Sequence, residues 1–373
     1  MSFEHLHLVV VGPLPPPAGG MANQTRQLAE LLRGEGAQVS VVQTNAPYRP
    51  RWAGRLPGLR AAFRLIPYLF ALWRACRHGD VMHLMANSGW SWHLFAVPAI
   101  LVARLRGVPV VVNYRGGEAG SFLSRAAGQV RLAMRQVAAL VLPSGYLQAV
   151  FQGHGMRGTV VPNIIDMTRF RPATESRAGQ APHVVVARNL ESIYGIDVAL
   201  RAFAQIREAL PAATLSIAGS GPQLASLQAL ADSLGVSDAV RFTGRLDRDD
   251  MAALYRSADV MINASRVDNM PNSVLEALAS GVAVVSTHVG GVPYIVEDES
   301  TALLVPPDAP EPMAQAVLRL LTDDALRRRL VDAGLAEVVR YQWARVSLQW
   351  LAVYQRALGH VPATGEAVGE ARP

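Results

Sequence analysis

The chain has 373 residues, of which 50% are hydrophobic and 17% are charged. This is a globular composition, and the length suits two cores better than one. A single cysteine, Cys76, excludes an internal disulfide and indicates a reducing compartment. The formal net charge is +6, and arginine supplies all 35 Lys and Arg positions. That charge favours anions such as phosphates or lipid headgroups, but no nucleic-acid-binding signature accompanies it, so we expect no nucleic-acid partner.

The first half of the chain alternates strand-like and helix-like segments. Residues 6–12 form a short apolar run, and residues 21–36 have helical spacing that ends at a glycine. Near-continuous Val, Leu and Ile runs are typical of parallel strands that are covered on both faces. Such runs occupy residues 38–43, 80–85, 108–113, 139–143 and 159–162.

Two apolar stretches could be mistaken for targeting or membrane segments. The N-terminus, MSFEHLHLVVVG, lacks a basic start and does not resemble a signal peptide, so we expect a cytoplasmic protein. Residues 81–103 carry no formal charge and are long enough to cross a bilayer. Because Asn87-Ser88-Gly89 is a loop signal, we expect a buried strand, a loop and a buried helix there instead.

The pattern restarts after a polar segment at 171–183, which we take as an interdomain linker. Two successive β/α blocks predict an α/β protein with two doubly wound sheets facing a cleft. We expect one domain over 1–170, a second over 183–340, an amphipathic helix at 341–358 and a disordered tail at 359–373. The expected strands of the second domain are 183–187, 213–219, 239–242, 259–263, 282–286 and 302–306.

Glycine-containing loops follow several of these strands. Gly19-Gly20 would let backbone N–H groups approach a ligand at the start of a helix. Gly219 and Gly221 repeat this arrangement in the second half, and Gly244 ends another strand. None of these loops is a G-x-G-x-x-G, so the sequence does not support a dinucleotide fingerprint.

The stretch DNMPNSVLEALASG, residues 268–281, combines a helix start with two acids. Pro271 suits the first turn of a helix, and Asn272 is a good N-cap. The unpaired N–H groups of that turn favour an anion such as a diphosphate. Asp268 and Glu276 would flank the anion, where each carboxylate could accept hydrogen bonds from sugar hydroxyls. The alternative role for Glu276 is to stabilise the helix dipole.

Several segments together resemble one known family. The sequence SRVDNMPNSVLEALASGVAVVSTHVGGVPYIV is similar to the donor-site signature of the retaining glycosyltransferases of family 4. Other family segments follow in the usual order and cover nearly the whole chain. They are PPAGG, VPNIIDMTRFRP, ARNLESIYGIDVALRAFA, LSIAGSGP, VRFTGRL and LYRSADVMINAS. The resemblance implies the GT-B fold, in which two Rossmann-like domains face a cleft and the C-terminal helix crosses back to the first.

The resemblance also implies roles for individual residues. Glu276 would bind the donor ribose, Asp268 would face the transferred sugar, and Arg188 would hold the diphosphate. Gly19 and Gly20 would close over the phosphate from the other domain. Gly219 is a further donor-binding position, and Arg245 and Leu246 would flank the base, mainly through their backbone. The remaining positions would make backbone contacts, Met270, Pro271 and Asn272 with the sugar, and Ser273 and Val274 with the phosphate.

Two positions depart from the family pattern. The family usually has Glu at the first acid, and Asp268 keeps the charge on a shorter side chain. A Lys is usual where this chain has Tyr194. We hypothesise that Arg115, which follows an expected strand, supplies the missing cation. A structural ion pair with Glu118 is the alternative role for Arg115.

The function implied is transfer of a hexose-type sugar from a nucleotide-diphosphate sugar to a glycan or lipid-linked acceptor in cell-surface polysaccharide biosynthesis. Asp268, Arg188 and Arg115 would be catalytic. We expect no cofactor and no metal, because the D-x-D within residues 247–250 precedes a helix and is better explained as a cap.

Two alternatives remain open from the residues. One is a nucleotide-sugar epimerase on the same architecture, and the other is a two-lobed binding protein without catalysis. The arginine-rich amphipathic stretch 51–77 is a candidate for peripheral contact with the inner face of a membrane, against the alternative of a surface helix packed on the first sheet.

Overall fold

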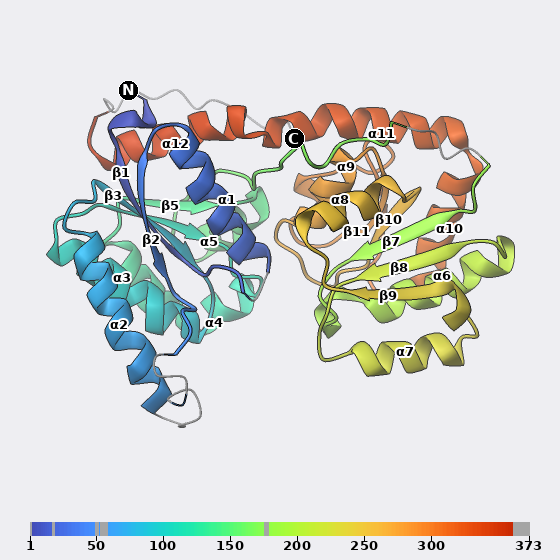
Figure 1. Ribbon diagram of the computed structural model, residues 1–373, viewed down its shortest axis with the longest axis horizontal. Helices are drawn as coiled ribbons and strands as arrows, with labels where there is room; N and C mark the ends of the chain where they lie inside the picture. Colours follow the sequence, from blue (N-terminus) through green and yellow to red (C-terminus); the bar gives the residue numbers. More distant parts are fainter. Residues whose placement is uncertain (1, 17–18, 49–51, 53–58, 175–178, 361–373) are drawn as a thin grey trace.

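The computed structural model contains two parallel six-stranded sheets that lie side by side, each with helices on both faces (Figure 1). It describes residues 2–16, 19–48, 52, 59–174 and 179–360. The predicted linker is described except for 175–178, and the predicted tail falls almost entirely on 361–373, outside the described residues.

The first sheet has the strand order β2-β1-β3-β4-β5-β6. Its order reverses between β1 and β3. Strand β1 pairs in parallel with both β2 and β3, for example Leu8 with Val39 and with Val81. Crevices for ligands form at such switch points, beyond the carboxyl ends of the strands. The strands are β1 (His7–Gly12), β2 (Gln38–Gln43), β3 (Val81–Ala86), β4 (Val110–Tyr114), β5 (Ala139–Leu142) and β6 (Thr159–Val160).

Alternating side chains of the first sheet enter two separate cores. Val9 and Val11 point to the core shared with the middle helices, and Leu8 and Val10 point to the core shared with the first and last helices. This burial on both faces explains the uninterrupted apolar runs of the sequence. The helices are α2 (Leu59–Ala75), α3 (Val97–Leu105), α4 (Ala119–Met134) and α5 (Gly145–Gly153) on one face, and α1 (Gly20–Gly34) and α12 (Trp343–Ala357) on the other.

The second sheet has the order β12-β11-β10-β7-β8-β9, which reverses between β7 and β10. Val184 and Val186 of β7 face a core with α6, α7 and α10, and Val185 faces a core with α8 and α9. The strands are β7 (His183–Ala187), β8 (Thr214–Ala218), β9 (Val240–Gly244), β10 (Val260–Asn263), β11 (Ala283–Thr287) and β12 (Leu303–Val305). The helices are α6 (Ile196–Ala209), α7 (Leu224–Ser233), α8 (Arg248–Arg256), α9 (Asn272–Ala279), α10 (Pro310–Thr322) and α11 (Asp324–Val338).

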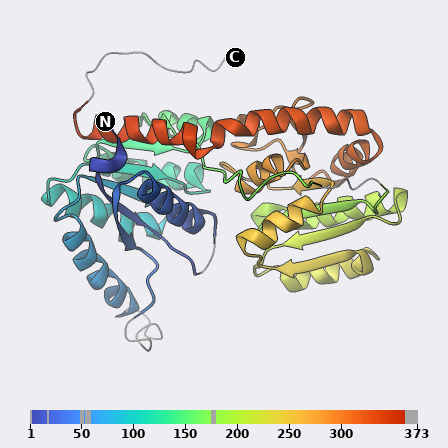
Figure 2. The same cartoon turned by 45° about the horizontal axis from the view of Figure 1, so that its top comes forward.

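The last two helices run along one side of both sheets (Figure 2). Helix α12 packs on the first sheet, where Val346, Trp350 and Tyr354 join the core that contains Leu8. The Tyr354 hydroxyl lies 2.7 Å from Nδ1 of His83, a buried residue of β3. The C-terminal segment therefore returns to the sheet formed by the start of the chain.

The apolar stretch at 81–103 forms buried β3, a loop, a π-helical turn (Trp92–Ala96) and most of α3. The expectation of strand, loop and helix is confirmed. No helix among the residues the structure describes is both long enough and apolar enough to cross a bilayer.

Candidate functional site

A cleft of about 490 Å³ lies between the two sheets, and residues that follow the carboxyl ends of their strands line it. Arg115 comes directly after β4 and Arg188 directly after β7. This is the position that a doubly wound sheet offers to ligands. The predicted site residues that line the cleft are Gly19, Gly20, Arg115, Arg188, Gly219, Arg245, Leu246, Asp268, Met270, Asn272, Ser273 and Glu276.

Two of the predicted residues are not among the described residues that line the cleft. Val274 has no exposed surface, because its side chain points into the core of the second sheet. Pro271 is the N-cap of α9 and has an extended backbone conformation. Any contact of these two residues with a ligand would have to come from their backbone atoms, which is how the resemblance placed them.

The N-termini of helices α1 and α9 meet across the cleft. Gly19 caps α1, and its carbonyl accepts the first intrahelical hydrogen bond, from Asn23 N at 2.9 Å. A Cβ built on Gly20 would lie 3.9 Å from the side-chain nitrogen of Asn272, the first residue of α9. Both helix ends carry unpaired N–H groups and partial positive charge, so together they favour an anion between the domains.

The side chain of Asn272 does not cap α9, so that expectation was wrong. Its Oδ1 instead accepts a 2.6 Å hydrogen bond from Nδ2 of Asn163, which also donates to the carbonyl of Met270 at 3.2 Å. Asn163 follows the last strand of the first sheet. Its amide therefore connects that part of the chain to the loop that begins α9.

Asp268 and Arg188 form an ion pair inside the cleft. Their side chains are only 10% and 12% exposed, and Nη2 of Arg188 also donates to Oγ of Ser265 at 3.0 Å. Burial lowers the pKa of Arg188, and nearby tyrosines and Glu276 oppose that shift. Asp268 therefore lies beside Arg188, the residue that the resemblance predicts to bind the diphosphate.

Two glycines allow the Asp268 loop to pack closely. A Cβ on Gly290 would overlap the carbonyl of Asp268, and one on Gly291 would overlap the carbonyl of Asn269. Gly291 N also donates to the Asp268 carbonyl at 2.9 Å. The two glycines of the VGG sequence are thus explained by the close packing of the loop that carries Asp268.

Glu276 faces the cleft from the first turns of α9, without an ion pair among the described residues. Its Oε2 accepts a 3.4 Å hydrogen bond from the hydroxyl of Tyr255. Burial raises the pKa of Glu276 to about 7, and the positive charge of Arg248 is the largest influence in the opposite direction. The two acids of the motif therefore have different environments. Asp268 is paired with a cation, whereas the pKa of Glu276 lies near neutral pH.

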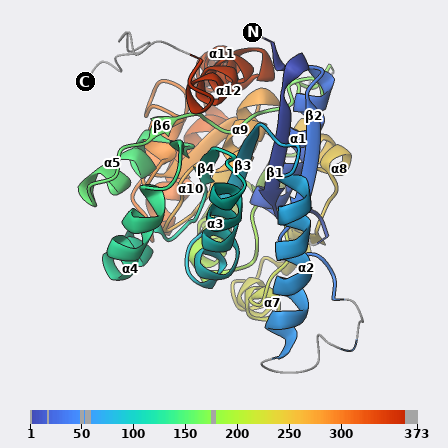
Figure 3. The same cartoon turned by 90° about the vertical axis from the view of Figure 1, so that its left-hand side faces the viewer.

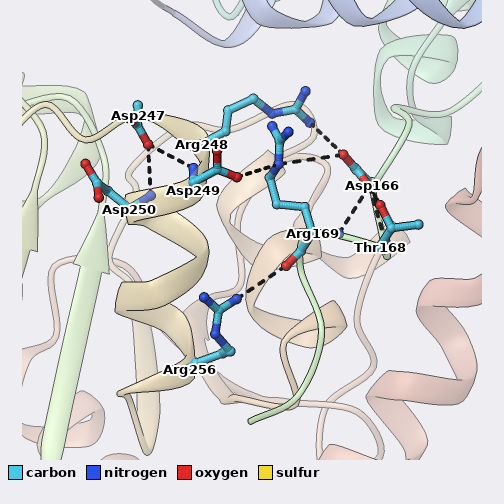
Figure 4. Close-up of polar contacts among 8 residues, drawn as sticks. All are labelled: Asp166, Thr168, Arg169, Asp247, Arg248, Asp249, Asp250 and Arg256. Carbon is cyan, nitrogen blue, oxygen red and sulfur yellow. Dashed lines mark hydrogen bonds and ion pairs between the residues drawn. The ribbon is translucent and has the colours of Figure 1, made fainter. Parts of the chain in front are cut away.

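Arg248 lines the cleft although the sequence reasoning gave it no role. It begins α8, and its Nη2 lies 4.0 Å from Oδ2 of Asp166, whose other oxygen, Oδ1, accepts a 2.7 Å hydrogen bond from the Thr168 hydroxyl (Figure 4). Asp247 caps the same helix through 2.9 Å hydrogen bonds from the backbone of Asp249 and Asp250. The D-x-D signal is a helix cap, as expected.

Arg115 donates from Nη1 to Oδ1 of Asn163, and its backbone N–H donates to Ala86 at 2.9 Å. No ion pair with Glu118 occurs among the residues that the structure describes, so that alternative is not supported. Burial lowers the pKa of Arg115 to about 10. Through Asn163, Arg115 reaches the loop that starts α9.

The glycines after β8 have a packing role. A Cβ on Gly219 would overlap the carbonyl of Arg188, and one on Gly221 would overlap that of Leu190. Nε of Arg245 donates to Oγ of Ser220 at 2.6 Å. These contacts hold the loops after β7, β8 and β9 together along one wall of the cleft. No group of three or more His, Cys, Asp or Glu side chains in the described ranges could hold a metal ion.

Family models and solved structures resemble this chain over nearly its whole length. The model for glycosyl transferases group 1 matches residues 168–336, and the one for glycosyltransferase family 4 matches residues 18–169. A solved sucrose-phosphate synthase from Thermosynechococcus elongatus covers 96% of this chain and 100% of its own, with a TM-score of 0.78 and 21% identity. The Anabaena HepE structure with UDP and glucose covers 93% and 99%, with a TM-score of 0.72 and 16% identity.

Curated relatives give the same result. A GDP-mannose-dependent alpha-(1-6)-phosphatidylinositol monomannoside mannosyltransferase from Mycobacterium tuberculosis is 31% identical over 90% of this chain and 94% of its own length. A D-inositol 3-phosphate glycosyltransferase from Segniliparus rotundus is 28% identical over 91% and 85%. The chain therefore belongs to glycosyltransferase family 4 and has the GT-B fold.

Proposed function

We propose that this protein transfers a hexose from a nucleotide-diphosphate sugar to a glycan or lipid-linked acceptor, with retention at the anomeric carbon. The observation that carries the proposal is the pair of helix N-termini facing each other across the cleft, with Arg188 and Arg115 beside them. That arrangement suits a diphosphate. The donor chemistry also fits relatives, since one is named as GDP-mannose-dependent and HepE was solved with UDP-glucose.

In this proposal the two acids bind the two sugars of the donor. Glu276, near Tyr255 and Arg248, accepts hydrogen bonds from the ribose hydroxyls. Asp268 accepts a hydrogen bond from the transferred sugar and keeps Arg188 in place. Arg188 binds the diphosphate, and the loops with Gly219, Arg245 and Leu246 border the base. Gly19, Gly20, Met270, Pro271, Asn272, Ser273 and Val274 supply backbone contacts.

The acceptor hydroxyl would attack the anomeric carbon from the side that the nucleotide leaves. As the new C–O bond forms, the bond to the diphosphate breaks, and the acceptor proton passes to a departing phosphate oxygen. The protein then contributes orientation and positive charge rather than a nucleophile. Mass spectrometry of the enzyme during turnover should detect no sugar attached to Asp268, and a trapped adduct there would overturn this mechanism.

Arg115 is the proposed second cation, in place of the family's Lys. It lines the cleft and is held by Asn163 near the start of α9. A charged hydrogen bond to a phosphate contributes about 1.5–3 kcal/mol, so Arg115→Ala should lower kcat or raise the donor KM at least tenfold. Unchanged values of both would remove Arg115 from the proposed site.

The acceptor and cellular place are further parts of the proposal. We propose a role in cell-surface polysaccharide or lipid-linked glycan synthesis at the inner face of the membrane. Helix α2 lies on the outer flank of the first sheet, beside α3 (Figure 3). Its side chains Ile66, Phe70 and Trp73 are 67%, 70% and 42% exposed at helical spacing, and exposed Arg74 and Arg77 follow. An apolar stripe ending in arginines suits an anionic lipid surface.

Flotation with anionic vesicles tests the membrane contact. Ile66 and Phe70 are already exposed, so Ile66→Asp with Phe70→Asp should leave the fold intact and abolish co-flotation. Leu348→Asp, at a 67% exposed position on α12, is the matched control and should float as the wild type does. Absence of wild-type flotation would remove the membrane contact, since the stripe would then have no lipid partner.

A thermal-shift titration with UDP, GDP, ADP and CMP tests the donor site. Ligand at one hundred times its Kd stabilises the folded state by about 2.7 kcal/mol, which is visible as a higher melting temperature. We expect one nucleotide diphosphate to act selectively and Glu276→Ala to lose the effect. Turnover of the corresponding nucleotide sugar with a glycan acceptor, unaffected by EDTA, would support a metal-independent transferase. Binding without turnover would favour a two-lobed binding protein.

A further inference from the structure

Tyr194 lies directly against the cation of the proposed donor site. The carbon at the centre of the Arg188 guanidinium is 4.4 Å from the centroid of the Tyr194 ring. At this distance the negative face of a ring attracts a cation, most strongly when water is excluded. Arg188 satisfies that condition, because its side chain is 12% exposed.

The backbone around Tyr194 holds the ring in this position. Tyr194 ends a 3-10 turn (Ser192–Tyr194), and its N–H donates to Glu191 at 3.0 Å. Gly195 follows in the left-handed region at φ +61°, where a Cβ would overlap the carbonyl of Ala264. Only glycine suits both the conformation and the contact. The turn therefore places the Tyr194 ring between the apolar core around α6 and Arg188.

A guanidinium has planar faces as well as N–H groups at its edge. The edge nitrogen Nη2 contacts Ser265 and Asp268, whereas the central carbon of the guanidinium lies over the Tyr194 ring. A second carboxylate in that place would neutralise the cation and compete for its N–H groups, and a lysine would repel it. A ring stabilises the charge while it accepts none of the in-plane hydrogen bonds.

We propose that Tyr194 is a positioning residue whose ring holds Arg188 in the cleft and leaves the charge and free N–H groups of Arg188 available to a diphosphate. This inference rests on the proposed donor site for its catalytic consequence. It also gives the residue at the position of the family's usual lysine a role of its own, because the ring positions Arg188 while Arg115 is the proposed second cation.

The first test needs no substrate. Tyr194→Leu keeps apolar bulk without an aromatic face, and Tyr194→Phe keeps the face without the hydroxyl. We expect Tyr194→Leu to lower the melting temperature by about 3–6 °C and Tyr194→Phe to change it little. In an Arg188→Met background the difference between the Leu and Phe variants should disappear. If the difference persists unchanged without Arg188, the ring acts only through its core packing and the proposal is wrong.

The second test measures turnover of UDP-glucose and GDP-mannose. Tyr194→Leu should lower kcat/KM roughly 10- to 30-fold, with Tyr194→Phe within about twofold of the wild type. A Tyr194→Lys variant that exceeds the wild type would show that this position requires charge, which would overturn the proposal. If the wild type turns over no nucleotide sugar, the proposed function fails, and the substrate-free comparison still decides whether the ring holds Arg188.

Discussion

The two faces of the cleft are built from different chemistry. The face on the second sheet carries charged side chains that are already engaged, such as Asp268 with Arg188 and Glu276 with Tyr255. The face on the first sheet presents the glycine-capped start of α1 and Arg115, whose guanidinium bonds to an amide. One face is rich in fixed charge, and the other offers mainly backbone and neutral amides.

This difference indicates a division of labour between the two faces. A fixed charge stabilises the charge that develops on a leaving group without any reorganisation of the protein. This suits the face of the cleft where the leaving group would bind. Backbone N–H groups at a helix start can close over the same anion without a bulky side chain. Asn163 joins the two faces, since it contacts both Arg115 and Asn272.

The largest effect is expected from Asp268→Asn on the charged face. The substitution leaves the buried Arg188 without its carboxylate, which should destabilise the fold by about 3 kcal/mol. It also removes the acceptor for the transferred sugar, so kcat should fall roughly 100-fold or more. Urea unfolding and steady-state kinetics measure the two effects.

Asp249→Asn is the matched control for Asp268→Asn. Asp249 also pairs with an arginine, Arg169 at 3.0 Å, but its side chain is 82% exposed and lies outside the cleft lining. A surface pair contributes little, so kcat should change less than about twofold. Equal losses in the two variants would contradict the special position of the Asp268 pair.

The pH dependence of donor binding distinguishes the two acids of the charged face. Burial places the pKa of Glu276 near 7, so below this pH the carboxyl must lose a proton before it accepts ribose hydrogen bonds. The association constant of UDP-glucose or GDP-mannose should therefore fall up to about tenfold per pH unit below 7 and be flat above it. Calorimetry from pH 5.5 to 8 measures this slope, and Glu276→Gln should remove it.

The raised pKa of Glu276 also affects the stability of the fold. Its contribution to stability changes with pH in the direction opposite to that of donor binding. Because the pKa in the folded protein lies above the ordinary 4.5, the folded state binds more protons between these values than the unfolded state does. The contribution of Glu276 to the free energy of unfolding should then decrease as pH rises from about 4.5 to about 7. An unchanged pH slope in Glu276→Gln would contradict this.

The smallest effect is expected where the two faces join. Asn163→Leu removes the hydrogen bonds to Met270 and Asn272 and the acceptor for Arg115, so the donor KM should rise about five- to tenfold. Gln148→Leu is the control, because Gln148 donates to Gly158 at 2.8 Å within the first half and lines no part of the cleft. A similar rise in KM for both variants would mean that Asn163 has no particular role in the site.

Much of the fold could be predicted because burial on both faces leaves a simple pattern in the chain. The runs before Gly12 and around Val184 gave the strands nearly to the residue. The site was harder, since helix caps and side-chain partners depend on neighbours that are far away in sequence. Asn272 looked like a cap but bonds to Asn163, 109 residues earlier. Tyr255 and Arg248 gave no signal, because a tyrosine within a helix and an arginine after a capping aspartate are common surface features.

The sequence by itself determined the two β/α blocks, the family and the acids Asp268 and Glu276, because periodicity and motif spacing are local along the chain. Only the tertiary structure decided that Arg188 pairs with Asp268, that Tyr194 covers the same guanidinium, and that burial leaves Glu276 titrating near neutral pH. Those properties arise from desolvation and from contacts between loops and helices that follow β7 and β10, which are far apart in the chain and become neighbours only when the second sheet forms.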